Sequence, residues 1–559
     1  MTTFRVHPAI GFARVGNSSE YVISPESMAG HPDPHVADVI GGLPIRPDTE
    51  YDLVTSSDLR DREGALKRHA ARFRIFAYDN LTTESWPRGD GVEVKIGTQV
   101  GGKTVTDIIW MVHVANKKAN WFVMVEEGPI QGIDSYSDGR LPPLRNVSVT
   151  EAKAPQPPVE KRIAHIDDPT RVAQLTIDAG PRTISGRSNA TVAFDRATVP
   201  SAYDMVKQRT VTLPDYPVSF PDFEDMEMPS GPIDTLGELK TDGSGRLLVL
   251  GGYGAAIGWK INGRIGVTDD VNNDQWFDDT SDGPVSATLV FDDGSQAQAA
   301  GAWVSTTDPA VAPQILNTVS AWDDIYDSWV RKLDLAPEIF NGKDFNNGYR
   351  PTFDDQIAPI FRSAAQQRWV VNLSAHGASA HDRLADISAA DDPHQTKLAG
   401  ILPIFRNPFE LDDPKSPQHN NTTMMPLALG DGYEPFLSLR KTQYFFLHRW
   451  NEGLGSFQSG SGKRLGPGEY LDKAVLVNCL GGRFSPGIDV TFIVREPATY
   501  VQPWQTNGTG PFRIKGKVLD YSRVLRRDQP FLTGGYVPRH REETGLEPGD
   551  FSKFMAVPW

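Results

Sequence analysis

The chain has 559 residues and a net charge of −15, from 56 basic and 71 acidic side chains. This balance opposes binding to the phosphate backbone of nucleic acids and favours solubility. Its length allows about three or four domains or one large core, and no stretch reaches the roughly 20 apolar residues of a membrane span.

The N-terminus and the cysteine content narrow the class of protein further. The first residues lack the basic start, long apolar core and small-residue cleavage site of a secretory signal. We therefore expect a cytoplasmic protein, with non-classical export as the other route. A single cysteine excludes an intrachain disulfide and a cysteine-rich metal site, and we expect no metal.

The first predicted elements are short strands. Residues Phe4–Gly16 read as two strand-like runs. The run Ile108–Val125 predicts a buried strand, a polar turn and a second strand. Lys117 and Lys118 lie in that turn, and we interpret them as a solvated lysine pair.

Glycine and proline shape the middle of the chain. Pro142–Pro158, rich in proline, alanine and charge, predicts a surface excursion or linker. The run Leu236–Gly254 predicts a strong buried strand followed by a glycine turn. With 51 glycines and 43 prolines, the chain is more typical of irregular β structure than of a helical bundle.

Four aspartates follow at 274, 278, 279 and 282, within Val271–Val285. They could form a carboxylate-lined loop for a cation or an ammonium group, as in a metal-dependent hydrolase. The spacing and terminal Glu of a calcium loop are absent, so turn formation by the aspartates is the simpler interpretation. A third interpretation is a loop that lines a site without binding metal.

Three segments in the second half predict helices. Thr318–Leu335 places two tryptophans at heptad spacing, which is core spacing. Pro359–Val371 resembles another helix, and Leu439–Glu452 is amphipathic and ends at Gly453. His448 borders the apolar stripe of that helix, as expected of a core or boundary histidine.

Familiar catalytic signatures are missing from the sequence. His376 and His381 are five residues apart rather than the four of a helical zinc site. The segment Gly460–Arg464 resembles a phosphate loop only superficially, and neither a GxSxG elbow nor a GxGxxG fingerprint is present. Common nucleophile, nucleotide and flavin chemistry is therefore not indicated.

These elements predict an α+β fold: a β-rich single large catalytic unit with inserted helices. We divide it into an N-terminal β-rich region, 1–235, and a catalytic region, 236–559. The two regions are not expected to fold independently.

The stretch Leu471–Val494 contains Cys479, the sole cysteine. A lone cysteine is usually a small buried hydrophobe. Here an apolar run precedes it, and a glycine pair, a Pro-Gly turn and a β-rich run at Val490–Val494 follow it. We therefore expect Cys479 at a sharp bend where a group can approach the sulfur closely.

Segments along the whole chain resemble the L-lysine ε-oxidase/glycine oxidase family of cysteine tryptophylquinone enzymes. They occur in order from the first residues to the last: FRVHPAIGFARVGN at 4–17, HVANKKANW at 113–121, LLVLGGYG at 247–254, WFDDTSDGPVSA at 276–287, NCLGGRFSPGID at 478–489, PFRI at 511–514 and PGDFSKFMAVPW at 548–559.

The resemblance implies a cofactor made from the protein itself. In that family a cysteine is joined by a thioether to a tryptophan that is oxidised to an ortho-quinone, and the matching residues are Cys479 and Trp559. The family also uses an aspartate near the quinone in cofactor formation. Our candidates are Asp550, nine residues before Trp559, and Asp472, seven before Cys479; Asp550 could instead be a helix-capping or turn residue.

The implied reaction is the oxidation of a primary amine. The amine condenses with a quinone carbonyl, a base removes the adjacent C–H proton, and the ring accepts two electrons. An aldehyde or keto acid, ammonia and H₂O₂ are released, with O₂ as the oxidant. The resemblance further implies a flavoprotein maturation partner, and we expect a homo-oligomer without nucleic-acid or membrane partners.

Two departures from the family pattern leave an alternative open. The family members continue past the matching tryptophan, whereas this sequence stops at Trp559, and the lysine oxidase has another cysteine near its site. The alternative is a quinone-free relative acting as a binding or structural protein. The sequence does not identify the substrate, which could be glycine, the lysine ε-amine or another amine.

Overall fold

The computed structural model describes most of the chain. The described residues are 2–79, 83–123, 142–146, 166–222, 226–227, 232–259, 266–267, 269, 271–310, 312–369, 374–393, 402–410, 425, 438–453, 464–479, 492–522, 529–538 and 545–558.

A 16-stranded mixed sheet dominates the described part of the chain. Its strands are β1 (Thr3–His7), β2 (Ile10–Arg14), β3 (Tyr21–Ile23), β4 (Arg68–Tyr78), β5 (Val92–Val94), β6 (Gln99–Val100), β7 (Lys103–Val112), β8 (Ala115–Asn116), β9 (Ile177–Asp178), β10 (Arg182–Ser185), β11 (Val192–Asp195), β15 (Thr235–Thr241), β16 (Leu247–Leu250), β19 (Ser281–Phe291), β20 (Gln296–Gln298) and β21 (Ala302–Thr307).

The order β10-β7-β19-β21-β2-β4-β16-β15-β11 runs through the centre of this sheet. Strand β2 pairs in parallel with β21 and antiparallel with β4, and β4 pairs antiparallel with β16. Strands from both sides of residue 235 therefore alternate within one hydrogen-bonded sheet.

Two smaller sheets accompany the large one. Strand β12 (Ser201–Asp204) pairs with β13 (Arg209–Thr212). The other sheet has the order β14 (Met226–Glu227), β17 (Ala256–Trp259) and β18 (Trp276–Asp278).

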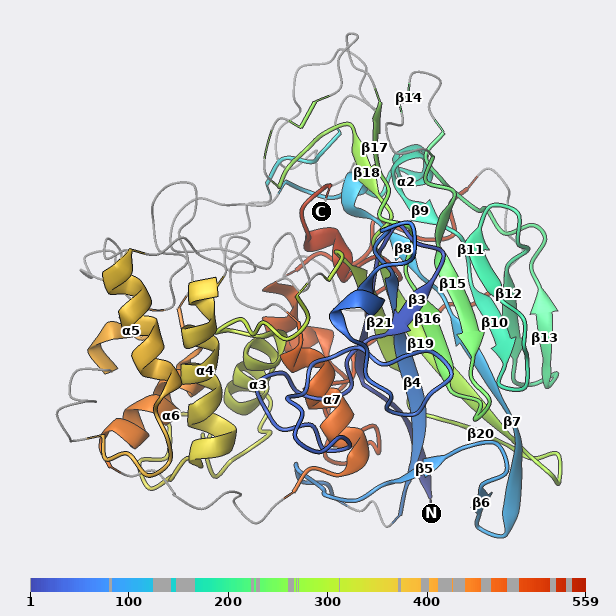
Figure 1. The fold of residues 1–559 in the computed structure, drawn as a ribbon. Helices are drawn as coiled ribbons and strands as arrows, with labels where there is room; N and C mark the ends of the chain where they lie inside the picture. Colours follow the sequence, from blue (N-terminus) through green and yellow to red (C-terminus); the bar gives the residue numbers. More distant parts are fainter. Residues whose placement is uncertain are drawn as a thin grey trace.

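The longer helices gather on one side of the large sheet (Figure 1). Among the described residues, the α-helices are α2 (Pro169–Leu175), α3 (Ala321–Lys332), α4 (Ala358–Gln366), α5 (Ala375–Ala385), α6 (Lys441–Asn451) and α7 (Pro467–Val477).

Local sequence sets the start of α3 and α7. Ser320 caps α3 and exchanges hydrogen bonds with Asp323, a capping box. Helix α7 has Pro467 at its first position, where a missing N–H costs no helical hydrogen bond.

Alternating side chains of the central strands divide the core. Ile10 and Phe12 of β2 and Trp303 of β21 pack in the same cluster as the apolar faces of α3, α6 and α7. Val304 of β21 belongs to a second cluster, formed with the other strands of the sheet. Successive side chains of a β strand point to opposite faces of the sheet, so one face packs on the helices and the other contributes to the second cluster.

The predicted α+β, β-rich fold class is confirmed. A helix overlaps each of the three predicted helical segments, and Trp329 is fully buried. His448 is half exposed beside Glu452, as a boundary histidine would be. His381 is buried in α5, where Nδ1 contacts the Ala364 carbonyl; the side chain of His376 lies outside the described residues.

Two local predictions were wrong. Lys117 and Lys118 are not solvated: both are fully buried, because carboxylates remote in sequence neutralise them. The end of the expected β-rich run at 490–494 is instead a 3₁₀ helix, Phe492–Arg495, with residues 490 and 491 outside the described part. The linker expected at 142–158 stays a prediction, because most of it lies outside the described residues.

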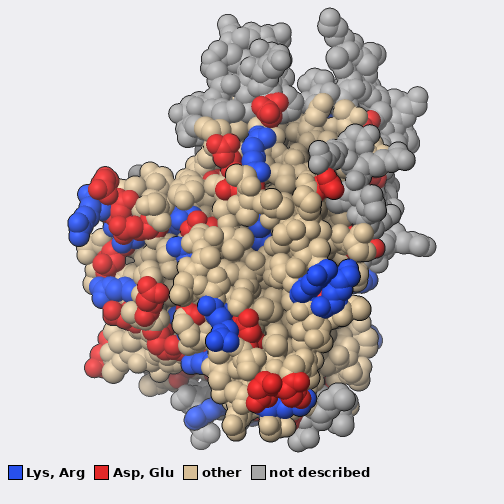
Figure 2. Space-filling view, turned by 90° about the vertical axis from the view of Figure 1, so that its right-hand side faces the viewer, with Lys and Arg blue, Asp and Glu red and all other residues tan. Residues whose placement is uncertain are grey.

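Charges on the surface are mixed in sign. On the face shown in Figure 2, basic and acidic side chains occur in small groups of both signs among uncharged residues. Among the described residues, none of the helices has the length and hydropathy that a membrane crossing requires.

Candidate active site around Cys479

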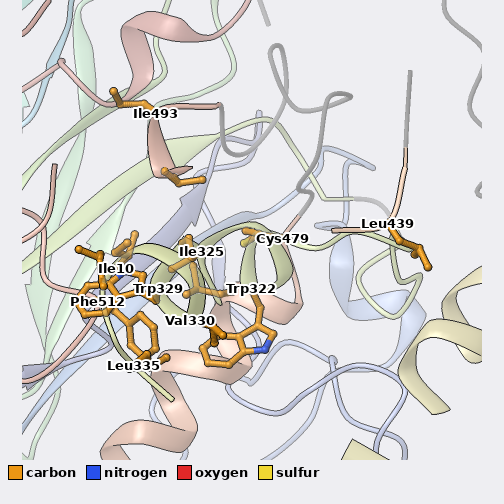
Figure 3. Close-up of a cluster of buried hydrophobic side chains, with 14 of the residues drawn as sticks. Ile10, Trp322, Ile325, Trp329, Val330, Leu335, Leu439, Cys479, Ile493 and Phe512 are labelled. Atoms are coloured by element: carbon orange, nitrogen blue, oxygen red, sulfur yellow. The ribbon is translucent and has the colours of Figure 1, made fainter. Parts of the chain in front are cut away.

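Cys479 follows directly after the last turn of α7. Asn478 ends the helix, and the Cys479 N–H donates to the Leu476 carbonyl at 3.2 Å. The Cys479 carbonyl accepts from the Ala321 N–H at 3.0 Å, so the cysteine adjoins the start of α3. Figure 3 shows Cys479 beside Ile325 and Trp322 of that helix.

The sulfur of Cys479 is buried, with 4% of the residue exposed. Its Sγ donates to the Val475 carbonyl, one helical turn earlier, at 3.2 Å. The Arg14 guanidinium reaches it from β2: Nη2 lies 3.9 Å from Sγ and 3.4 Å from the Asn478 carbonyl. A cation is thus held next to the thiol, in a site closed to bulk solvent. The residues after Cys479, 480–491, lie outside the described part, so the predicted glycine bend stays a prediction.

The segment that leads to Trp559 is fixed by main-chain pairing. Val557 donates its N–H to the Val271 carbonyl at 3.1 Å, and its carbonyl accepts from Nδ2 of Asn273 at 2.9 Å. Met555 accepts from Arg145. Trp559 itself lies outside the described residues, so its predicted role stays a prediction.

Asp282 anchors the same segment from β19. Its carboxylate accepts from the Phe551 N–H at 3.1 Å, the Ser552 N–H at 2.6 Å and the Ser552 hydroxyl. It also accepts from Nε1 of Trp303 at 2.9 Å. Burial is the largest influence on this group and raises the pKa of Asp282 to about 6. The carboxylate therefore acts as an acceptor for four donors from two elements.

Asp550 belongs to a buried ion-pair cluster. Its Oδ1 accepts from Lys553 at 2.8 Å and Lys117 at 3.1 Å, and its Oδ2 accepts from the N–H groups of Tyr536 and Glu547. Four donors thus occupy a carboxylate that has no solvent exposure. Burial lowers the pKa of Lys553 to about 8, against the pull of Asp550.

Asp472, the other candidate, faces the N-terminal strands from α7. Its Oδ1 accepts from the Ala9 N–H at 2.6 Å and lies 2.9 Å from His7 Nδ1. Nε2 of His7 lies 3.0 Å from the Tyr78 hydroxyl. Burial lowers the pKa of His7 more than the neighbouring carboxylate raises it, so the imidazole is neutral at pH 7. Asp472 and Asp550 therefore share no hydrogen-bond partner among these contacts.

Aromatic packing brings the two flanking segments together. Phe492, at the end of the stretch that follows Cys479, meets Phe554 edge to face at 5.2 Å. Phe554 also packs against Trp121 at 5.0 Å. Cys479, Phe492 and Phe554 all pack in the same apolar cluster. The sole cysteine and the segment before Trp559 are thus parts of one core.

The aspartate run at 274–282 is neither an exposed loop nor a set of simple turns. Asp278 accepts from the Thr280 N–H, as a turn residue would, but it is fully buried at the end of β18 and pairs with Lys118 at 2.8 Å. Asp282 lies in β19, so turn formation alone was the wrong interpretation for these two. Within the described ranges, no three carboxylate, histidine or cysteine side chains are grouped as a metal site.

Asp279 is expected to make stability depend on pH. Its carboxylate is buried against Gly252, Oδ1 has no hydrogen-bond partner within the described part, and burial raises its pKa to about 7 from 3.8. Between these two pKa values the folded protein holds a proton on Asp279 that the unfolded chain has released. The free energy of unfolding therefore falls as pH rises from about 4 to 7. Asp279→Asn should stabilise the protein at pH 8 by about 2–4 kcal/mol and flatten this slope.

Urea unfolding at pH 5 and pH 8 measures this effect. Asp354→Asn, at an exposed position, is the matched control and should leave the slope unchanged. An Asp279→Asn protein that keeps the full pH dependence would show that another group causes it.

Arg14 was not singled out by sequence reasoning, although it lies in the matched segment FARVGN. Asp282 was singled out only as one of four aspartates in a loop, not as the anchor of the segment before Trp559. The signal available was a charged residue inside a strongly apolar or strand-forming run, since burying a charge requires a partner.

Comparisons with known proteins identify relatives of the whole chain. The L-Lysine epsilon oxidase N-terminal family model matches residues 7–306, and the L-lysine epsilon oxidase C-terminal domain model matches residues 419–559. The chain is 29% identical to L-lysine 6-oxidase of Marinomonas mediterranea over 589 residues, covering 99% of this chain and 70% of that protein.

Solved structures show the same likeness. The L-Lys epsilon-oxidase from Marinomonas mediterranea superposes with a TM-score of 0.73 at 27% identity. Its Schiff base intermediate with L-Lys superposes with a TM-score of 0.72 at 28% identity. Each comparison covers 100% of this chain and 74% of the other. Because one family model alone spans more than half of its residues, the chain belongs to the L-lysine ε-oxidase family.

Proposed function

We propose that the protein is an amine oxidase that uses a cysteine tryptophylquinone formed from Cys479 and Trp559. The observation that carries this proposal is the burial of the sole thiol in the same core as the segment leading to Trp559, in a member of the L-lysine ε-oxidase family. The sequence has no second thiol that could compete with Cys479 as the thioether partner.

Each group in this reaction has a separate task. The quinone would supply a carbonyl for the primary amine and an acceptor for two electrons. Arg14 holds positive charge at the sulfur. The surrounding apolar cluster excludes water, which strengthens electrostatic interactions inside the site.

Asp472 and Asp550 support the proposal as positioning residues. Asp472 fixes α7 to the N-terminal strands, and Asp550 fixes the chain nine residues before Trp559. Both are occupied by donors, which fits anchoring of the two cofactor-forming segments. For either carboxylate to act as a base, it would first have to break some of these hydrogen bonds.

Mass spectrometry tests the cofactor directly. The protein is co-expressed with a flavoprotein maturation partner, digested with trypsin and mapped. The proposal expects a cross-linked peptide pair containing Cys479 and Trp559, together with visible absorption from the quinone. An unmodified Cys479 thiol in protein matured in this way would reject it and favour a quinone-free relative with a binding or structural role.

Oxygen consumption over the twenty amino acids tests the substrate. L-Lysine is the first candidate, because a relative is named L-lysine 6-oxidase and a relative was solved with L-Lys. Lysine oxidised at its ε-amine would give an aldehyde, ammonia and H₂O₂. Glycine and other amines follow in the same assay.

A further inference from the structure

A cavity of about 530 Å³ lies among α3, α4, α6 and α7. This volume is within the range of small-molecule sites. One wall is aromatic: Trp322 and Tyr326 of α3 are stacked with ring centroids 5.0 Å apart, and the Trp86 ring lies 5.8 Å from that of Trp322. Phe446 of α6 and Ile360 of α4 add further apolar surface. The cavity therefore suits a ligand with an aromatic or large apolar part.

The wall also carries charges of both signs. Lys473 of α7 is partly exposed and lines the cavity, with Nζ 5.6 Å from the centroid of the Trp322 ring. Asp355 and Asp323 line the same cavity. Burial lowers the pKa of Lys473, whereas these two carboxylates raise it, Asp355 more than Asp323. The lysine is thus close enough to feel both carboxylates, yet within the described ranges it forms an ion pair with neither.

Asp355 is the carboxylate that is open to a ligand. It is exposed, and its contact with the Thr352 hydroxyl, at 3.5 Å, is at the limit of a hydrogen bond. Asp323 is instead used in the cap of α3, where Oδ2 accepts from the Ser320 N–H at 2.8 Å and from the Ser320 hydroxyl at 2.7 Å. Lys473 and Asp355 therefore form a cation and an anion that share one cavity without closing on each other.

The remaining ionisable groups of the wall do not change this pairing. Glu338 and Arg464 are exposed, and neither affects the pKa of Lys473. Burial, together with the positive charge of Lys473, lowers the pKa of His31 to about 3, so its imidazole is neutral at pH 7.

We propose that this cavity binds a zwitterionic α-amino acid with an aromatic or large apolar side chain. The ligand carboxylate would accept from Lys473 and the ligand ammonium would donate to Asp355, and charge-assisted hydrogen bonds of this kind are the stronger ones. The ligand side chain would lie against Trp322 and Phe446. An acid without an amine would leave Asp355 unpaired, and an amine without an acid would leave Lys473 unpaired. The proposal goes beyond the oxidase reaction and holds whether or not the quinone forms, because it concerns binding alone.

Calorimetry with L-phenylalanine as the probe tests this site. The full chain is produced without a maturation partner, so that no quinone can react with the amine. L-Phenylalanine should bind at one site per chain. Phenethylamine, which lacks the carboxylate, and 3-phenylpropanoate, which lacks the ammonium, should each bind at least about tenfold more weakly. Glycine, which lacks the apolar side chain, should also bind more weakly than L-phenylalanine.

Two variants assign the two ends of the ligand. Lys473→Met keeps the aliphatic stem and should weaken L-phenylalanine binding about tenfold while leaving phenethylamine binding unchanged. Asp355→Asn should weaken L-phenylalanine binding by a similar factor and leave 3-phenylpropanoate binding unchanged. Asp354→Asn, at the neighbouring exposed aspartate outside the cavity wall, is the matched control and should bind as the wild type does. The Tm of each variant shows whether it is folded.

Three results would overturn the proposal. They are no binding of L-phenylalanine to the wild type, binding of phenethylamine or 3-phenylpropanoate as tight as that of L-phenylalanine, and unchanged L-phenylalanine affinity in both folded variants. The comparison of ligands needs no variant, so it decides the question even where a variant fails to fold.

Kinetics of the matured enzyme distinguish two sources of the amino acid. Oxidation of L-phenylalanine, with a raised KM and unchanged kcat in Asp355→Asn, would assign the cavity to the substrate. A changed rate of oxidation of another amine, without oxidation of L-phenylalanine, would assign it to a separate effector. Both results support the binding site, and failure of the quinone to form would leave the calorimetry unaffected.

Discussion

Cys479→Ser is expected to abolish amine oxidation while leaving the fold intact. A serine hydroxyl is close in size to the thiol and can still donate to the Val475 carbonyl, so packing around the residue changes little. It is a far weaker nucleophile and redox partner than sulfur, and the chain has no second cysteine to replace it. Oxygen consumption, visible absorption and Tm of the two matured proteins measure the effect.

Val475→Ala is the control for local packing. It removes two methyl groups one helical turn before Cys479 but keeps both the thiol and the carbonyl that the thiol contacts. We expect a lower Tm with oxidase activity retained. Amine oxidation by Cys479→Ser at the wild-type rate would contradict the role of the sulfur.

Asp550→Asn is expected to destabilise the protein by about 3–5 kcal/mol, the usual cost of leaving a buried charge unpaired. Lys553 is fully buried over the Trp121 ring, 3.7 Å from its centroid, and Asp550 is the carboxylate that pairs with it. An amide carries no charge, and its NH₂ group would face other donors. Urea unfolding at pH 7 gives the change in the free energy of unfolding.

Two further variants show whether the ion pair causes that loss. Asp344→Asn, at an exposed aspartate, should change stability by less than about 0.5 kcal/mol. Combining Asp550→Asn with Lys553→Met should cost less than the sum of the single changes, because the second removes the charge that the first leaves unpaired. Strict additivity would contradict coupling between the two groups.

The fold class followed from local patterns, because periodicity and turn residues are local properties. The apolar stripe around Leu447 predicted α6, and the heptad spacing of Trp322 and Trp329 predicted α3. Lys117 and Lys118 show where such reasoning ends. Their partners Glu547, Asp550 and Asp278 lie 430, 433 and 160 residues away, so no local pattern could reveal that the lysines are buried.

The candidate site could be predicted only in part. The turn residues that follow the single cysteine marked Cys479 as a candidate, whereas composition alone favoured an inert buried thiol. The choice of Trp559 among twelve tryptophans came from family resemblance, because nothing in the spacing of aromatic residues selects it. The anchoring role of Asp282 depends on β19 lying beside the segment at 549–552, a long-range contact that sequence patterns do not encode.

The parallel pairing of β2 with β21 has a consequence for synthesis on the ribosome. Arg14 and Thr307, which face each other in that pair, are 293 residues apart. At about 5–20 residues per second, the nascent N-terminus would wait roughly 15–60 s for its neighbour to emerge. During that interval an apolar strand edge stays open to other chains. The yield of folded protein should therefore depend on the supply of chaperones and on the rate of translation, which is slow at low temperature.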